Sequence, residues 1–177
     1  MSDINRGAIN SEREELNLAF DFHYPIEQCL RKWHALNRCA RIVAEPGLII
    51  TAPPAGFQQA VVHLVDNACK FRSRGGRIDI ELAANGANGC IFTVSNEGAP
   101  IPPELRERVF EKYFQINRNN HRKHNGLGVG LTIAQAFARR LGGDVVIPDA
   151  DSKCMVQMTL PPAQLDGEAA DDPSTDS

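Results

Sequence analysis

Apolar and polar residues along the chain follow two different periods. Alternation with a period of two predicts short β-strands at residues 16–22 and 48–51. Two such runs, 78–82 and 90–95, flank the turn sequence NGANG and therefore predict a β-hairpin. A second hairpin is predicted from VVIP (145–148) and CMVQMTLP (154–161).

Other segments repeat their apolar residues every three or four positions, which is typical of helices. The first predicted helix begins at Pro25 and ends before Pro46-Gly47, with Ile26, Leu30, Trp33, Leu36, Ala40 and Val43 on its apolar face. A second helix is predicted over 55–70, a short amphipathic one over 104–110, and a last one that ends at Gly142-Gly143. This order of elements predicts an α/β fold, with helices packed on one face of a mixed sheet.

Composition and charge narrow the class of protein. With 177 residues, 42% of them hydrophobic, the chain is long enough for one domain with its own core. The sequence has no run of 18 apolar residues and no apolar segment in MSDINRGAINSEREE, so we expect a cytoplasmic protein without direct membrane insertion. The five cysteines follow no metal-binding or disulfide spacing, which favours buried, reduced thiols.

Charge is distributed unevenly along the chain. The formal net charge is −3, but the segment from Asp166 onward contains five acidic residues and no basic one, so the rest is nearly neutral. We therefore expect flexible ends at 1–14 and 163–177 around a folded domain at 15–162. No large basic surface is predicted, which argues against a nucleic-acid partner.

Three alternating glycines occur in NGLGVGL, where the last long helix begins. Glycine costs roughly 0.5–1 kcal/mol relative to alanine inside a helix, so helix formation alone does not explain them. Bare backbone next to the unpaired N–H groups of a helix start suits a bound phosphate. A flexible loop that leads into a helix is the alternative interpretation.

A polar stripe lies on the second predicted helix. His63, Asn67 and Lys70 are spaced by four and three residues, so their side chains project from one side. An amide oxygen can join the ligand shell of Mg²⁺, and a lysine ammonium can neutralise phosphate oxygens. A solvated helix face is the alternative explanation of this stripe.

Four motifs in order resemble the catalytic and ATP-binding domain of bacterial sensor histidine kinases. These motifs are HLVDNACKF (63–71), SNEGAPIP (95–102), FEKYF (110–114) and GLGVGL (126–131), and the resemblance covers about residues 16–162. The same nucleotide-binding fold, known as the GHKL or Bergerat fold, occurs in DNA gyrase, the heat-shock chaperone ATPase and MutL. The resemblance implies a two-layer sandwich of a mixed sheet of about five or six strands with three helices on one face.

The resemblance also implies a site for ATP and Mg²⁺. Asn67 would coordinate Mg²⁺, Lys70 would reach the phosphates, and Phe71 would pack against adenine. Asn96 lies where the family usually has the aspartate that accepts a hydrogen bond from the adenine amino group. Catalytic roles are implied for Asn67, Lys70 and Arg122, and the residues implied to bind the nucleotide are His63, Asn67, Lys70, Phe71, Asn96, Gly98, Ile101, Phe114, Gly126, Leu127, Gly128, Val129, Gly130 and Leu131.

The resemblance further identifies residues 115–125 as the ATP lid. Phe110 and Phe114 would anchor this lid, and Arg118, Arg122 or Lys123 could contact the γ-phosphate. The three glycines would close the lid onto the triphosphate and present helix N–H groups to it.

Several positions depart from the family pattern. His63 stands where kinases usually have asparagine and ATP-hydrolysing relatives have a catalytic glutamate, so a structural role is favoured for it. The first glycine motif has Asn96 and Pro100 in place of an aspartate and a glycine, which predicts weakened nucleotide affinity. None of the five histidines has the neighbours of a phosphoacceptor histidine.

The resemblance therefore implies a domain that donates the γ-phosphoryl group of ATP to a histidine elsewhere. The acceptor would lie on a histidine-containing dimerisation domain, and a response regulator would act downstream in two-component signalling. Two alternatives stay open: a nucleotide-sensing or inactive interaction module of the same fold, and a serine kinase of the anti-sigma-factor type.

Overall fold

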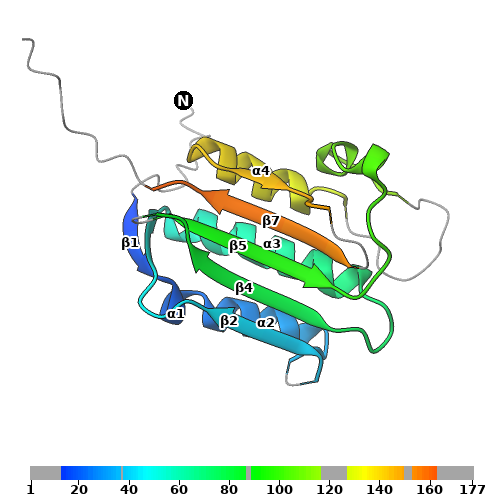
Figure 1. Ribbon diagram of the computed structural model, residues 1–177, viewed down its shortest axis with the longest axis horizontal. Helices are drawn as coiled ribbons and strands as arrows, with labels where there is room; N and C mark the ends of the chain where they lie inside the picture. Colours follow the sequence, from blue (N-terminus) through cyan, green and yellow to red (C-terminus); the bar gives the residue numbers. More distant parts are fainter. Residues whose placement is uncertain (1–12, 37, 87–88, 117–126, 150–152, 163–177) are drawn as a thin grey trace, which may run out of the picture.

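The computed structural model describes residues 13–36, 38–86, 89–116, 127–149 and 153–162. A five-stranded mixed sheet, in the order β2-β4-β5-β7-β6, forms one layer. Its β2–β4 pair is parallel and its other pairs are antiparallel. Helices α2, α3 and α4 lie together on one side of this sheet (Figure 1). The structure thus confirms the predicted α/β sandwich with a mixed sheet.

A separate two-stranded sheet is formed by one strand before α2 and one strand after β2. Strand β1 (Glu14–Asn17) pairs antiparallel with β3 (Ile49–Ala52). The strand predicted over 16–22 is wrong beyond Asn17, because α1 (Leu18–Asp21) begins there. Leu18 and Phe22 are both buried and lie four residues apart, so their spacing fits a helical turn as well as a strand.

The helix predicted from Pro25 to Pro46 is two elements rather than one. Helix α2 (His23–Lys32) ends early, and His34 in the following turn has a positive φ of 52°. Strand β2 (Ala40–Ala44) then pairs in parallel with β4 (Ile78–Ala84). Ala40 and Val43 therefore lie in a strand and not on a helix face. The register with β4 is a non-local contact that local periodicity does not reveal.

Helix α3 (Pro54–Phe71) lies in the helical layer between α2 and α4 (Gly130–Arg140) (Figure 1). The buried face of α3 follows the predicted helical period and comprises Phe57, Ala60, Val61, Leu64, Val65, Ala68 and Cys69. Ala134 and Ala138 are the buried residues of α4, and their small side chains let it pack closely against its neighbours. The two helices thereby hold the polar stripe of α3 next to the start of α4.

The hairpins of the large sheet are confirmed. Strand β4 pairs with β5 (Cys90–Asn96), which also pairs with β7 (Cys154–Leu160), and β7 pairs with β6 (Asp144–Val146). The short helix predicted over 104–110 is instead two 3-10 turns, Pro103–Leu105 and Arg108–Phe110. Pro102 and Pro103 begin this segment, and proline lacks the N–H group that a longer helix would use.

Candidate functional site

The polar stripe of α3 faces the first residue of α4. A Cβ atom placed on Gly130 would lie 3.4 Å from Nδ1 of His63, so the imidazole packs beside the start of α4. Asn67 and Lys70 follow His63 on the same stripe and are, like it, half-buried. The structure thus brings His63 next to Gly130, and Asn67 and Lys70 continue the same stripe along α3.

Asn96, Gly98 and Phe71 come together at the other end of the stripe. A Cβ atom on Gly98 would overlap the carbonyl oxygen of Phe71 and lie 2.6 Å from Nδ2 of Asn96. Glycine is therefore required at position 98 for the end of α3 to approach the end of β5. The ring of Phe71 is 57% exposed, and the Lys70 ammonium lies 5.2 Å from its centroid.

The Asn96 side chain is buried and incompletely hydrogen-bonded. Its residue is only 2% exposed, and within the part of the chain that the structure describes Nδ2 has no hydrogen-bond partner. An unpaired buried amide group costs about 1–3 kcal/mol, so such a group is rare without a ligand or a water to satisfy it. Asn96 Nδ2 is therefore a buried donor that the described residues leave unsatisfied.

Backbone hydrogen bonds hold the Phe71 end of α3 against the segment after β5. Ser73 N donates to the carbonyl oxygen of Glu97 at 2.6 Å, and Glu97 N donates to that of Arg77 at 2.9 Å. Gly76 is buried in the same turn, where a Cβ atom would lie 2.7 Å from the Glu97 carbonyl oxygen. These contacts fix the positions of Phe71 and Asn96 relative to each other.

The glycine-rich segment is attached to the end of the 3-10 segment. Tyr113 N donates to the carbonyl oxygen of Gly128 at 3.0 Å, and Thr132 Oγ1 donates to that of Phe110 at 2.7 Å. Gly128 has a positive φ of 69°, and a Cβ atom on it would lie 2.8 Å from the Phe114 carbonyl oxygen. Position 128 thus requires glycine for reasons that lie within the protein itself.

The other predicted binding residues are placed as follows. Leu127 is 76% exposed, whereas Val129, Gly130 and Leu131 are partly buried at the start of α4. Phe114 is partly buried, and the Arg108 guanidinium lies 4.5 Å from its ring centroid. The carbonyl oxygen of Ile101 accepts a hydrogen bond of 3.3 Å from Arg106 Nε. Arg118, Arg122, Lys123 and Gly126 lie outside the described residues.

Burial changes the acid–base properties of the stripe. Partial burial lowers the pKa of His63, and the nearby Asp66 carboxylate opposes this shift. The same two causes act on Lys70, whose pKa is also lowered. Asp66 itself points toward α2, where Trp33 Nε1 donates to its Oδ1 at 2.7 Å. The imidazole of His63 is therefore biased toward its neutral form.

All five cysteines are free thiols, and four of them are buried. Burial raises the pKa of Cys90 to about 12 and also raises that of Cys154. A hydrogen bond between Cys29 and Cys69 raises the pKa of Cys69 and lowers that of Cys29. The cysteines therefore contribute mainly to packing, as their scattered spacing indicated.

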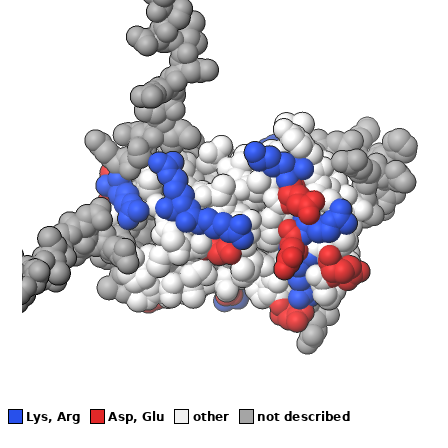
Figure 2. All heavy atoms as spheres, turned by 90° about the horizontal axis from the view of Figure 1, so that it is seen from above, with Lys and Arg blue, Asp and Glu red and all other residues white. Residues whose placement is uncertain are grey.

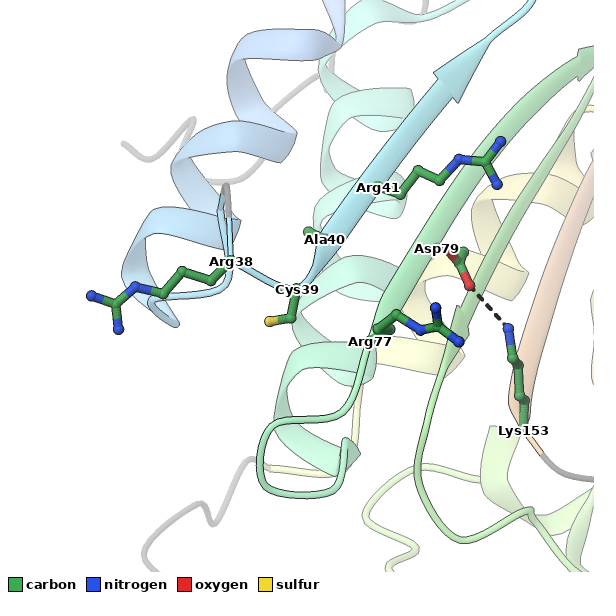
Figure 3. Close-up of a pocket in the computed structure, with 7 residues that line it drawn as sticks. All are labelled: Arg38, Cys39, Ala40, Arg41, Arg77, Asp79 and Lys153. Carbon is green, nitrogen blue, oxygen red and sulfur yellow. Dashed lines mark hydrogen bonds and ion pairs between the residues drawn. The ribbon is translucent and has the colours of Figure 1, made fainter.

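A hollow of about 530 Å³ lies on the opposite, open face of the sheet (Figure 3). Arg41, Arg77, Asp79 and Lys153 project over this face, while Arg38 points away from them. Lys153 Nζ pairs with Asp79 Oδ2 at 3.0 Å, and Arg77 Nε pairs with Glu97 Oε1 at 3.0 Å. The hollow contains none of the predicted site residues.

The surface and the described side chains add three observations. Figure 2 shows acidic side chains beside basic ones on the face seen from above. Among the residues described, no group of three His, Cys, Asp or Glu side chains could hold a metal ion. In the same part of the chain, no helix is long and apolar enough to cross a membrane.

Two residues with structural links to the site were missed by the sequence interpretation. Thr132 attaches α4 to Phe110, and Tyr113 adopts a positive φ of 65° where it contacts Gly128. The available signal for Thr132 was a hydroxyl-bearing residue in the first helical turn after the glycines. The backbone conformation of Tyr113 left no comparable signal in the sequence.

The structure is an α/β sandwich with a mixed sheet, and comparison with known families gives its class. Residues 52–164 match the model of the histidine kinase-, DNA gyrase B-, and HSP90-like ATPase family. The chain belongs to this family, and its relatives are sensor histidine kinases.

Individual relatives agree with this assignment. The chain is 33% identical over 133 residues to an uncharacterized sensor-like histidine kinase of Rhizobium meliloti, covering 75% of this chain but only 24% of the relative. The mycobacterial sensor histidine kinase MprB superposes with a TM-score of 0.72 at 24% identity, covering 84% of this chain and 97% of that structure. Full-length ShkA in complex with AMPPNP superposes with a TM-score of 0.73 at 21% identity, covering 89% of this chain and 33% of that one. The chain thus spans about a quarter of its Rhizobium relative.

Proposed function

We propose that this domain binds Mg-ATP and donates the γ-phosphoryl group to a histidine on a separate domain or chain, within two-component signal transduction. The observation that carries the proposal is the buried Asn96 amide, whose Nδ2 lacks a partner beside Gly98 and the exposed ring of Phe71. Family membership supplies the nucleotide class, because the matched family consists of ATPase-like domains.

Asn96 and Phe71 form the proposed adenine end of the site. An asparagine amide offers both a donor and an acceptor, which suits the ring nitrogen and the exocyclic amino group of adenine. The exposed Phe71 ring offers a flat apolar surface on which the base can stack. Gly98 lets the Phe71 backbone and the Asn96 amide lie close together at this end.

Asn67 and Lys70 form the proposed phosphate end together with the start of α4. Mg²⁺ usually takes one or two protein ligands in addition to substrate phosphates and water, so a single amide oxygen from Asn67 fits this ion. When bound, Mg²⁺ would neutralise charge on the phosphates. The Lys70 ammonium would provide further positive charge, and the first N–H groups of α4 would donate hydrogen bonds.

Phosphoryl transfer requires positioning and charge neutralisation more than covalent chemistry from the protein. In this proposal the chain orients the triphosphate, and the attacking imidazole comes from a histidine-containing dimerisation domain. A response regulator would then receive the phosphoryl group. The bounds proposed for the catalytic domain remain residues 15–162.

The proposal is tested with γ-labelled ATP, Mg²⁺ and the purified chain, in the presence and absence of a dimerisation domain with an accessible histidine. We expect label on the added domain that is labile in acid and stable in alkali, and no stoichiometric labelling of the chain itself. Asn67→Ala should abolish both Mg-dependent ATP binding and transfer. Gln59→Ala removes an exposed amide from the same helix and should change neither.

Other outcomes distinguish the alternatives. ATP binding without any transfer would favour a nucleotide-sensing module. Acid-stable phosphoserine on a protein partner would favour a serine kinase. Unchanged ATP affinity in Asn67→Ala, with Mg²⁺ present, would show that Asn67 is not the metal ligand.

A further inference from the structure

We propose that the hydroxyl group of Thr132 is a positioning group that fixes the phosphate-binding backbone at Gly128–Gly130. This inference rests on the proposed function, because it concerns the phosphate end of the same site. Thr132 lies in the first turn of α4, and its Oγ1 donates a hydrogen bond of 2.7 Å to the Phe110 carbonyl oxygen. Phe110 is 22 residues away in the sequence, so this bond joins two separate segments.

A second link joins the same two segments. Tyr113 N donates to the Gly128 carbonyl oxygen at 3.0 Å. Tyr113 is three residues after Phe110, and Gly128 is four residues before Thr132. The backbone of 129–131 lies between these two attachments. Because that stretch is so short, a shift of Thr132 relative to Phe110 must move the backbone of Gly130 and its neighbours.

The first turn of α4 keeps backbone N–H groups that have no acceptor inside the helix. Val129, the residue that precedes α4, makes no side-chain capping hydrogen bond in the part of the chain that the structure describes. The first helical bond of α4 runs from Ile133 N to the Val129 carbonyl oxygen, so the N–H groups before Ile133 have no acceptor inside the helix.

The test compares ligands with and without phosphates. Thr132→Val keeps the side-chain shape but removes the donor, and we expect it to weaken Mg-ATP binding by about 3- to 10-fold, as for one lost hydrogen bond. Adenosine, which lacks phosphates, should bind within about twofold of the unaltered chain. Thr132→Ser restores the hydroxyl and should restore Mg-ATP affinity. Calorimetry measures the ATP affinity, and NMR titration measures the weaker adenosine affinity.

A matched control lies on the open face of the sheet. Thr93→Val also removes a threonine hydroxyl, which there accepts a hydrogen bond of 3.3 Å from Gln157 Nε2, and should change neither affinity. If thermal denaturation shows that Thr132→Val folds poorly, Thr132→Cys provides a weaker donor of similar size, with a smaller but still phosphate-selective loss expected.

The outcomes separate this inference from the proposed function. If the unaltered chain binds Mg-ATP, two results for Thr132→Val would overturn the role of Thr132. These are equal losses of affinity for Mg-ATP and adenosine, or no loss for either ligand. Failure of the unaltered chain to bind Mg-ATP would overturn the proposed function and this inference with it. A phosphate-selective loss that Thr132→Ser reverses would support it.

Discussion

The two ends of the candidate site differ in the chemical groups that they present. At the adenine end, the key group is a side chain: the Asn96 amide, 2% exposed and held by backbone bonds between the end of α3 and the segment after β5. At the phosphate end, the key groups are backbone N–H groups after Gly128 and the partly exposed side chains of Asn67 and Lys70. The proposed adenine end thus depends on one buried side chain, and the proposed phosphate end depends on charge and backbone donors.

This difference predicts that substitutions at the two ends should affect nucleotide binding in different ways. A rigid, desolvated amide discriminates between bases, because a base that mismatches it leaves a buried polar group unpaired. Charges and backbone donors near solvent recognise any phosphate of suitable length. Changes at the adenine end should therefore alter which nucleotide binds, and changes at the phosphate end should alter how strongly its phosphates are held.

At the adenine end, the largest effect is expected from Gly98→Ala. The new methyl group would overlap the Phe71 carbonyl oxygen and press on Asn96 Nδ2, so both groups must move. We expect ATP affinity to fall by about 2 kcal/mol, or about thirtyfold, from the lost hydrogen bond and stacking. Overpacking should also destabilise the fold by about 1–3 kcal/mol. Calorimetry and urea denaturation measure the two quantities.

Gly47→Ala is the control for this substitution. Gly47 has a positive φ of 73°, but a Cβ atom there would meet nothing within 4 Å. It should therefore cost about 1–2 kcal/mol of backbone strain and leave ATP affinity unchanged. An equal loss of affinity in both variants would show that lower stability, and not the geometry at Gly98, weakens binding.

A smaller effect of opposite sign is expected from Asn96→Asp. A charge-assisted hydrogen bond is worth about 1 kcal/mol more than a neutral one, so ATP should bind about fivefold more tightly, with sharper selectivity over GTP. The structure adds a cost: a carboxylate at this buried position loses its hydration, so the nucleotide-free variant should unfold at a lower temperature at neutral pH.

Asn85→Asp makes the same change where Asn85 Nδ2 donates to the Leu160 carbonyl oxygen, outside the site, and should leave ATP affinity unaltered. Unimproved ATP binding by Asn96→Asp would mean that Asn96 does not face the adenine amino group.

Much of the fold was predictable because its central elements have strong local signals. Helix α3 carries an uninterrupted apolar face, and strands β4 and β5 alternate cleanly around a glycine-rich turn. The N-terminal region was not predicted as well. Leu18 and Phe22 fit two periods, and ARIVA is a strand because it pairs with β4, a partner about 38 residues later in the chain.

The candidate site likewise has features that could be predicted from the sequence and features that could not. Its residue types could be identified from motif resemblance, and the proximity of Phe71, Asn96 and Gly98 agrees with that expectation. The unpaired state of Asn96 Nδ2 and the Thr132–Phe110 bond could not be inferred, because both depend on how distant segments pack. The structure also gives Gly128 an internal reason to be glycine, which the sequence interpretation attributed to a ligand.

The smallest predicted effect is a pH dependence of stability that arises at the phosphate end and not at the adenine end. Phe71, Asn96 and Gly98 have no titratable side chain, whereas His63 lies against Gly130 at the phosphate end. Burial lowers the pKa of His63 in the folded protein, so between that pKa and the ordinary value near 6.5 the unfolded chain binds more protons. The stability that His63 contributes is therefore complete above about pH 6.5 and is lost as the pH falls.

The test is urea denaturation of the unaltered chain and of His63→Gln between pH 8 and pH 5. As the pH falls, the unfolding free energy of the unaltered chain should decrease relative to that of His63→Gln. His34→Gln, at an exposed histidine in the turn after α2, is the matched control whose own pH dependence is subtracted. A difference that grows in favour of the unaltered chain at low pH would mean that a carboxylate, and not burial, dominates the surroundings of His63.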